Sequence, residues 1–70
     1  MNIAQNDGSL NITLGSPLGV SVLDATGKLI AASSKTAQAH HFSTELWSTG
    51  MYIVRIEGDN WYHNRKVWIP

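Results

Sequence analysis

The strongest structural signal in this chain is a turn followed by alternating apolar residues, Leu-Trp-Ser-Thr-Gly-Met-Tyr-Ile-Val-Arg-Ile at positions 46–56. Gly50 ends the turn and can take a positive φ that other residues avoid. Side chains over residues 51–57 would point alternately to the two faces of a strand. One face is entirely apolar and is predicted to point into a core; it carries Tyr52, Val54 and Ile56.

A second strand is predicted directly after the first. Gly58-Asp59-Asn60 is a charged turn signal, and residues 61–69 form a longer strand. The two strands are expected to pair antiparallel and close the fold. In the last strand Val67 and Ile69 are assigned to the core, so Lys66 and Trp68 should face outward.

The rest of the chain also consists of short alternating segments separated by turn residues. Gly15-Ser16-Pro17 is expected to break one strand from the next, and Asp24-Ala25-Thr26-Gly27 suits a type I turn whose glycine forms a bulge. Residues 44–47 could hold a short helical turn, but no segment has a 3.6-residue period. The further predicted strands are residues 1–6, 10–14, 18–23, 28–32 and 37–43.

About seven short, mostly antiparallel strands at this spacing indicate an all-β sandwich. Each fully buried aliphatic side chain contributes ~1.5–3 kcal/mol. Together about a dozen of them would offset the ordering entropy of so short a chain by a small margin. The predicted core consists of Leu10, Ile12, Leu14, Val20, Val22, Leu29, Tyr52, Val54, Ile56, Val67 and Ile69.

Three motifs occur in order along the chain. The first is a strand–turn–strand segment, Val20-Ser21-Val22-Leu23-Asp24-x-x-Gly27-Lys28-Leu29-Ile30. The second is Gly50-x-Tyr52, which is preceded by a leucine at Leu46. The third is Lys66-Val67-x-Ile69, at the end of the sequence. In order, spacing and terminal position they resemble the C-terminal sorting domain of cargo proteins of the type IX secretion system of Bacteroidetes. The resemblance runs from about residue 16 to the last residue.

That resemblance implies an immunoglobulin-like sandwich of seven strands and a non-catalytic secretion signal. In this family an outer-membrane translocon recognises the domain, and a surface sortase-like protease usually removes it and attaches the cargo to lipopolysaccharide. Residues 1–70 are therefore expected to be one sorting domain, a fragment of a protein exported through the periplasm to the cell surface or the medium. Pro70 departs from the family, whose members commonly end on a basic or polar residue. The expected signal residues are Asp24, Gly27, Gly50, Tyr52, Lys66, Val67, Trp68, Ile69 and Pro70.

Composition narrows the classes of partner. The chain has 70 residues, no cysteine, and five acidic against five basic side chains. A single domain of this size buries ~60% of the surface of its unfolded chain, so its stability should be modest. The lack of cysteine excludes a disulfide framework and cysteine zinc sites. Balanced charge gives no footprint for nucleic acid, and no apolar run approaches the ~20 residues of a membrane-spanning helix.

Catalytic and metal-binding patterns are weak. His40 and His41 are adjacent on a predicted strand and would point to opposite faces, so with His63 they are interpreted as surface or rim histidines. Ser43, His41 and Asp24 could be named as a triad, but no nucleophile-elbow sequence accompanies them. We therefore expect no enzymatic activity and no cofactor.

A generic accessory β-sandwich, such as a fibronectin-like spacer or a carbohydrate-binding module, is the alternative function. Trp47 and Trp61 would cap the ends of the core or form a sugar platform, with capping favoured. Trp68 suits either a protein contact or packing against a neighbouring domain. The terminal strand discriminates, because a spacer should tolerate trimming of residues 66–70. If that strand lies at a sheet edge, a second copy could also pair with it to form a homodimer.

Overall fold

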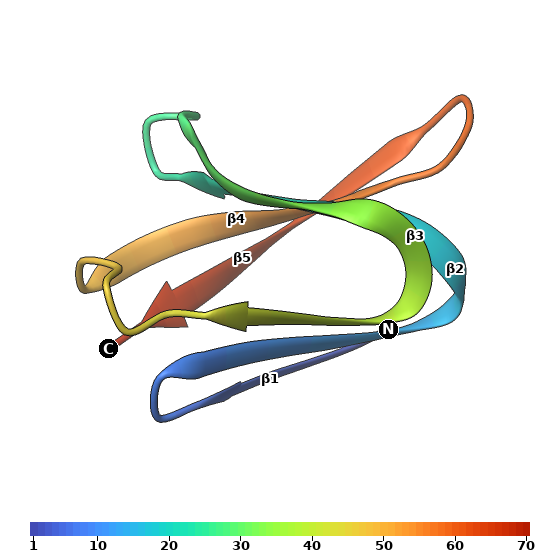
Figure 1. Ribbon diagram of the computed structural model, residues 1–70. Helices are drawn as coiled ribbons and strands as arrows, with labels where there is room; N and C mark the ends of the chain where they lie inside the picture. Colours follow the sequence, from blue (N-terminus) through green and yellow to red (C-terminus); the bar gives the residue numbers. More distant parts are fainter.

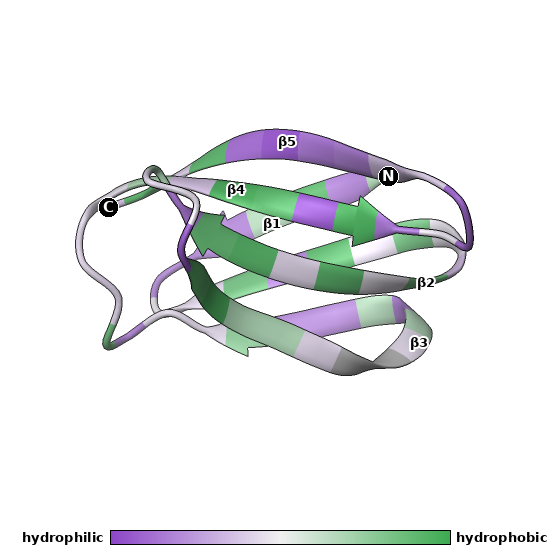
Figure 2. Ribbon diagram, turned by 90° about the horizontal axis from the view of Figure 1, so that it is seen from above, coloured by the Kyte–Doolittle hydropathy of each residue, from purple (hydrophilic) through white to green (hydrophobic). Residues whose placement is uncertain are grey.

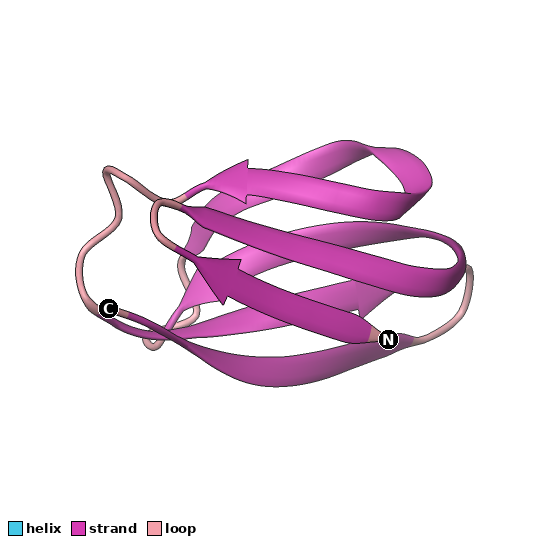
Figure 3. Ribbon diagram, turned by 90° about the horizontal axis from the view of Figure 1, so that it is seen from below, coloured by secondary structure: helices cyan, strands magenta, loops and turns pink.

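The computed structural model is built from strands and loops (Figure 3), and it describes the backbone of all 70 residues and the side chains of residues 1–33 and 36–70. The all-β class predicted from the alternation is confirmed. In the part of the chain that the structure describes, no helix is long and apolar enough to cross a membrane. The strands are β1 (Asn2–Asn6), β2 (Ser9–Asp24), β3 (Leu29–Ser43), β4 (Gly50–Glu57) and β5 (Tyr62–Ile69).

All pairings in the sheet are antiparallel, and two long strands curl it. The order is β1-β2-β4-β5, with β3 paired to β2 along its length. β2 has 16 residues and β3 has 15, and both bend sharply near their middles (Figure 1). The first half of β2 lies between β1 and the second half of β3. The second half of β2 lies between β4 and the first half of β3. The bent sheet thus places its two halves face to face (Figure 1).

The predicted segments are present, but two of the predicted breaks are bends. Gly15-Ser16-Pro17 was expected to end a strand, and this is wrong, because β2 continues through it. β3 likewise joins the strands predicted at residues 28–32 and 37–43, so about seven short strands become five. The β2–β3 register shifts between Thr13 and Leu18. Pro17 lies inside this shift, where it need not donate a ladder hydrogen bond.

A buried histidine stabilises the bend of β2 and β3 through hydrogen bonds. His40 is 5% exposed, and its Nε2 lies 2.8 Å from the carbonyl oxygens of both Leu18 and Ala37. Since both partners only accept, Nε2 carries the proton and donates. The expectation of a surface or rim position is therefore wrong for His40, whose ring ties β3 to the bulged part of β2. His41 points to the opposite face, as the alternation predicts, and its Nδ1 lies 2.7 Å from Oδ1 of Asn11.

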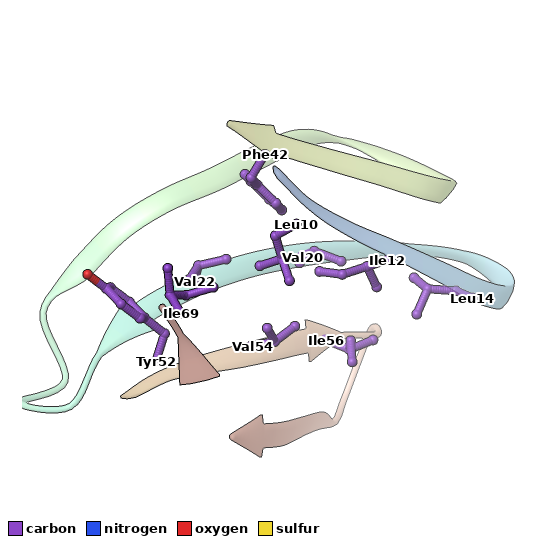
Figure 4. Packing of buried hydrophobic residues seen from close by; sticks show 10 residues of the cluster. All are labelled: Leu10, Ile12, Leu14, Val20, Val22, Phe42, Tyr52, Val54, Ile56 and Ile69. Atoms are coloured by element: carbon purple, nitrogen blue, oxygen red, sulfur yellow. The ribbon is translucent and has the colours of Figure 1, made fainter. Parts of the chain in front are cut away.

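The core lies between the two halves of the sheet (Figure 4). Leu29 was predicted to lie in it but is 58% exposed, because a register shift between Val22 and Leu23 places Leu29 opposite the outward Leu23. Val67 is only half-buried. Phe42, whose strand could not be oriented from sequence, is buried. The buried cluster consists of Leu10, Ile12, Leu14, Val20, Val22, Phe42, Tyr52, Val54, Ile56 and Ile69.

Candidate recognition site

The Asp24–Gly27 turn is held by one carboxylate oxygen. Oδ1 of Asp24 accepts hydrogen bonds from the Thr26 backbone N–H at 2.9 Å, the Thr26 hydroxyl at 2.6 Å and the Lys28 backbone N–H at 3.0 Å. The Gly27 N–H donates to the Asp24 carbonyl oxygen at 3.0 Å, as a type I turn requires. Gly27 has φ +89°, a left-handed conformation that strains any residue with a Cβ. The predicted turn and its glycine are therefore confirmed.

These donors also fix the charge of the turn. The Thr26 hydroxyl, and after it the Lys28 backbone N–H, lower the pKa of Asp24 below its usual value of 3.8. Hydrogen bonds to the ionised form are the physical cause, since they stabilise the carboxylate and not the acid. Asp24 is consequently a fixed negative charge at neutral pH.

The Gly50-x-Tyr52 motif joins a loop to β4. Tyr52 is 6% exposed, and its hydroxyl donates to the Ser48 carbonyl oxygen at 2.7 Å. Its ring lies 5.2 Å from that of Trp47, which in turn lies 6.4 Å from Phe42. Trp47 thus covers the end of the core, as predicted. The arrangement is similar to a tyrosine corner, in which a buried tyrosine bonds back to the backbone upstream of its strand.

The loop of residues 44–49 is anchored and yet carries an exposed leucine. The Thr44 N–H donates to the Gly8 carbonyl oxygen and the Trp47 N–H to the Thr44 carbonyl oxygen, both at 3.0 Å. The latter bond closes a single turn where a short helical turn was predicted. Leu46, between these anchors, is 99% exposed. The loop is held in place without any contribution from Leu46 to the core.

The turn that contains Asp24 and the loop that leads into the Gly50-x-Tyr52 motif line one groove. It encloses about 420 Å³ between the Asp24–Thr26 turn and the loop of residues 46–51. Ile30 and Met51 stand at its rim, 37% and 43% exposed. Asp24 is thus brought beside Gly50 and Tyr52 although it is far from them in sequence. The sequence pointed to these three and to Leu46 as motif residues but not to a shared groove, which depends on the pairing of β2 with β4, where Asp24 lies opposite Tyr52.

β5 places the terminal motif on the edge of the sheet. Among the strand pairs that the structure describes, it pairs with β4 alone, with Trp68 opposite Met51 and Lys66 opposite Ile53. Ile69 is 1% exposed and anchors the strand, whereas Trp68 is 60% exposed and Lys66 is exposed beside it. Much of β5 is hydrophilic (Figure 2). The predicted orientation of the strand is confirmed, and Pro70 follows it as an exposed residue.

Trp61 lies differently from Trp47. It is 51% exposed, and a Cβ added to Gly58 would clash with its indole ring, so the ring covers the β4–β5 turn. It also lines a small hollow with Leu14, Leu18 and Ile56 at the other end of the core. Trp61 therefore caps that end only in part.

The described residues hold no group of three or more His, Asp or Glu side chains that could bind a metal ion. What the structure presents is an all-β domain with an apolar groove, one carboxylate held by its turn and an edge strand with outward Trp68 and Lys66. These are features of a protein-recognition domain.

The chain belongs to the secretion system C-terminal sorting domain family, whose model matches residues 6–70. No curated protein and no solved structure matches it. Membership identifies the domain as a C-terminal sorting signal of type IX secretion in Bacteroidetes. It implies interaction with the type IX machinery and export to the cell surface or secretion.

Proposed function

We propose that this domain is a non-catalytic signal that the outer-membrane type IX translocon recognises in its folded form, after export of the cargo into the periplasm. The observation that carries the proposal is that the two faces of β5 differ: one packs on the core and the other is exposed. Ile69 is buried and secures the strand, while Trp68 and Lys66 project from its other face. Exposed aromatic and basic side chains beside free strand backbone suit a protein contact.

Recognition of a folded domain explains why the motifs combine structural and exposed residues. Gly27 permits the turn, and Tyr52 secures a loop through its hydroxyl. Neither presents a large exposed surface. In this proposal they hold the fold, whereas Trp68 and Lys66 touch the translocon.

The test is a soluble reporter with an export signal, fused in front of residues 1–70 and expressed in a secretion-competent Bacteroidetes strain. The wild-type fusion should reach the surface or the medium. Trp68→Ala should remain folded and accumulate in the periplasm. Tyr62→Ala is the matched control, because Tyr62 is an exposed aromatic residue on the same strand, 64% exposed. Retention of the wild-type reporter in the periplasm would refute the proposal.

Processing is a separate step of the proposal. We propose that a sortase-like protease removes the domain at the surface and joins the cargo to lipopolysaccharide. The surface reporter should then have lost the 7.7 kDa of this domain. A surface reporter of full length would show that the domain is retained.

The free edge of β5 also allows pairing with a second copy of the chain. We propose that such dimers form at high protein concentration through antiparallel β5 strands. Sedimentation over a range of concentrations should then show a monomer–dimer equilibrium. A monomer at all concentrations would exclude this use of the edge.

A further inference from the structure

The groove between the Asp24–Thr26 turn and the loop of residues 46–51 has an apolar rim that the fold does not require. Leu46, Met51 and Ile30 come from three segments and are 99%, 43% and 37% exposed. Single exposed apolar residues are ordinary, but a group gathered around one hollow indicates a binding surface. A volume of about 420 Å³ accommodates one or two side chains of a partner.

The loop that carries Leu46 is anchored by hydrogen bonds on both sides of this residue. Leu46 lies between Thr44, whose N–H bonds to Gly8, and Ser48, whose carbonyl oxygen accepts from Tyr52. Trp47 packs on Tyr52 beneath it. A surface held in its binding conformation loses little entropy on association, which favours affinity.

One charge stands at the groove. Asp24 is the sole acidic or basic residue among the described residues that line it, and the charge of Lys28, outside the lining, is a minor influence that also lowers the pKa of Asp24. Its turn contacts all use Oδ1, so Oδ2 has no hydrogen-bond partner among the described residues. A ligand that inserts an apolar side chain can therefore bring a cation to Oδ2, whereas an anion would be repelled.

We propose that this groove binds a peptide segment of a partner protein in which an apolar side chain is flanked by lysine or arginine. The apolar side chain lies against Leu46 and Met51, and the cation faces Asp24. The inference rests on the proposed function, because the partner is taken to be a protein of the secretion machinery. Met51 pairs with Trp68 in the sheet, so the apolar surface continues from the groove to β5 and one partner can cover both.

Peptide titration followed by amide NMR shifts tests the chemistry directly. The probe is Gly-Lys-Leu-Phe-Lys-Gly, with Gly-Glu-Leu-Phe-Glu-Gly and Gly-Lys-Ser-Ser-Lys-Gly as its charge and apolar controls. The first peptide should shift residues 24–26 and 46–51 and bind at least about fivefold tighter than either control, a difference near 1 kcal/mol. Equal binding of all three, or shifts elsewhere, would overturn the proposal.

Two variants remove one feature each. Leu46→Ser removes the most exposed rim residue, and Asp24→Asn removes the charge but keeps an Oδ1 acceptor for the turn. Both should weaken binding of the lysine peptide severalfold while the amide spectrum stays that of the native fold. Leu29→Ser is the control, since Leu29 is 58% exposed and lies outside the groove. If Leu29→Ser weakens binding equally, the groove is not the site.

The reporter assay separates this inference from the proposed function. If the wild-type domain exports the reporter, Leu46→Ser and Asp24→Asn should reduce export and Leu29→Ser should not. Normal export by both groove variants would refute the partner assignment even if the peptide binds. If the wild-type domain exports nothing, the proposed function fails, and the peptide titration alone then decides whether the groove binds basic apolar peptides.

Discussion

The hydroxyl of Tyr52 donates a 2.7 Å hydrogen bond to the carbonyl oxygen of Ser48, four residues upstream. This bond closes the loop before β4 onto the first inward side chain of the strand. It ties Tyr52, the second residue of the Gly50-x-Tyr52 motif, to the loop that precedes Gly50. The Trp47 ring packs beside the Tyr52 ring, with 5.2 Å between their centroids.

Tyr52→Phe should destabilise the domain by ~0.5–1.5 kcal/mol, the usual net contribution of a hydrogen bond. The ring stays, so the contact with Trp47 is kept and the cost isolates the hydroxyl. Urea unfolding followed by tryptophan fluorescence measures it. Tyr62→Phe, at a 64% exposed position, should change stability by less than ~0.5 kcal/mol. Equal stability of Tyr52→Phe and wild type would show that the bond does not hold the loop.

The glycines differ in what their backbones require. Gly27 has φ +89° and Gly50 has φ +156°, and a Cβ would meet no atom within 4 Å at either position. Gly27→Ala should cost ~1–2 kcal/mol from backbone strain alone. Gly50→Ala should cost less, because its φ is nearer to extended, and Gly50→Val should cost more than Gly50→Ala.

Gly15→Ala is the control for these substitutions. Gly15 also has open space around its Cβ position but does not have a positive φ. Its substitution should leave the melting temperature unchanged or slightly raised. A loss as large as that of Gly27→Ala would contradict the strain argument.

The pH dependence of stability should contain a contribution from Asp24. Its pKa is lowered in the folded state, chiefly by the Thr26 hydroxyl, so folding favours the carboxylate. This stability is fully present above the unfolded pKa and is lost as pH falls through the lower folded pKa. Carbon-detected NMR titration should show the pKa of Asp24 below 3.8, and Thr26→Val should raise it. An unchanged pKa in Thr26→Val would remove the assigned cause.

The local pattern along β2 and β3 predicted which faces of the strands are buried but not where the strands bend. The alternation of Leu10, Ile12 and Leu14, and of Val20 and Val22, marked the inward faces correctly. Residues 15–17 looked like a break, because glycine and proline disfavour strands. Whether such a segment ends a strand or bends it depends on the pairing of β3, which local pattern does not contain.

The site shows the same limit. Asp24, Gly27, Gly50 and Tyr52 could be singled out because turns and strand starts have local chemistry. The prediction that Leu29 lies in the core is wrong because the register shift between Val22 and Leu23, which the local pattern does not show, turns Leu29 to the outer face. The groove could not be foreseen for a similar reason, since it forms where the pairing of β2 with β4 places Asp24 opposite Tyr52, and local pattern does not contain that pairing.

The buried histidine at the bend gives a further prediction. His40→Leu keeps an apolar side chain of fair size but removes the Nε2–H that serves the carbonyl oxygens of Leu18 and Ala37. Buried acceptors left unpaired cost ~1–3 kcal/mol, so the domain should lose about that much stability. His41→Leu is the control, because His41 is exposed. If both variants unfold at the same urea concentration, His40 does not fasten the bend.

The last strand separates stability from recognition. Ile69→Ala should cost ~2–5 kcal/mol, because Ile69 is 1% exposed and its loss leaves a cavity. Val67→Ala should cost less, about 1–2 kcal/mol, since Val67 is half-buried and smaller. Lys66→Ala should change stability by less than ~0.5 kcal/mol, because Lys66 is exposed.

Melting and export must be measured on the same three variants. Ile69→Ala should lose export because it unfolds, whereas Lys66→Ala should lose export while it melts like wild type. That combination identifies Lys66 as a contact and Ile69 as an anchor. If Lys66→Ala unfolds the domain, the outward orientation of Lys66 is wrong. If Lys66→Ala stays folded and is exported as efficiently as wild type, the translocon does not depend on contact with the Lys66 side chain.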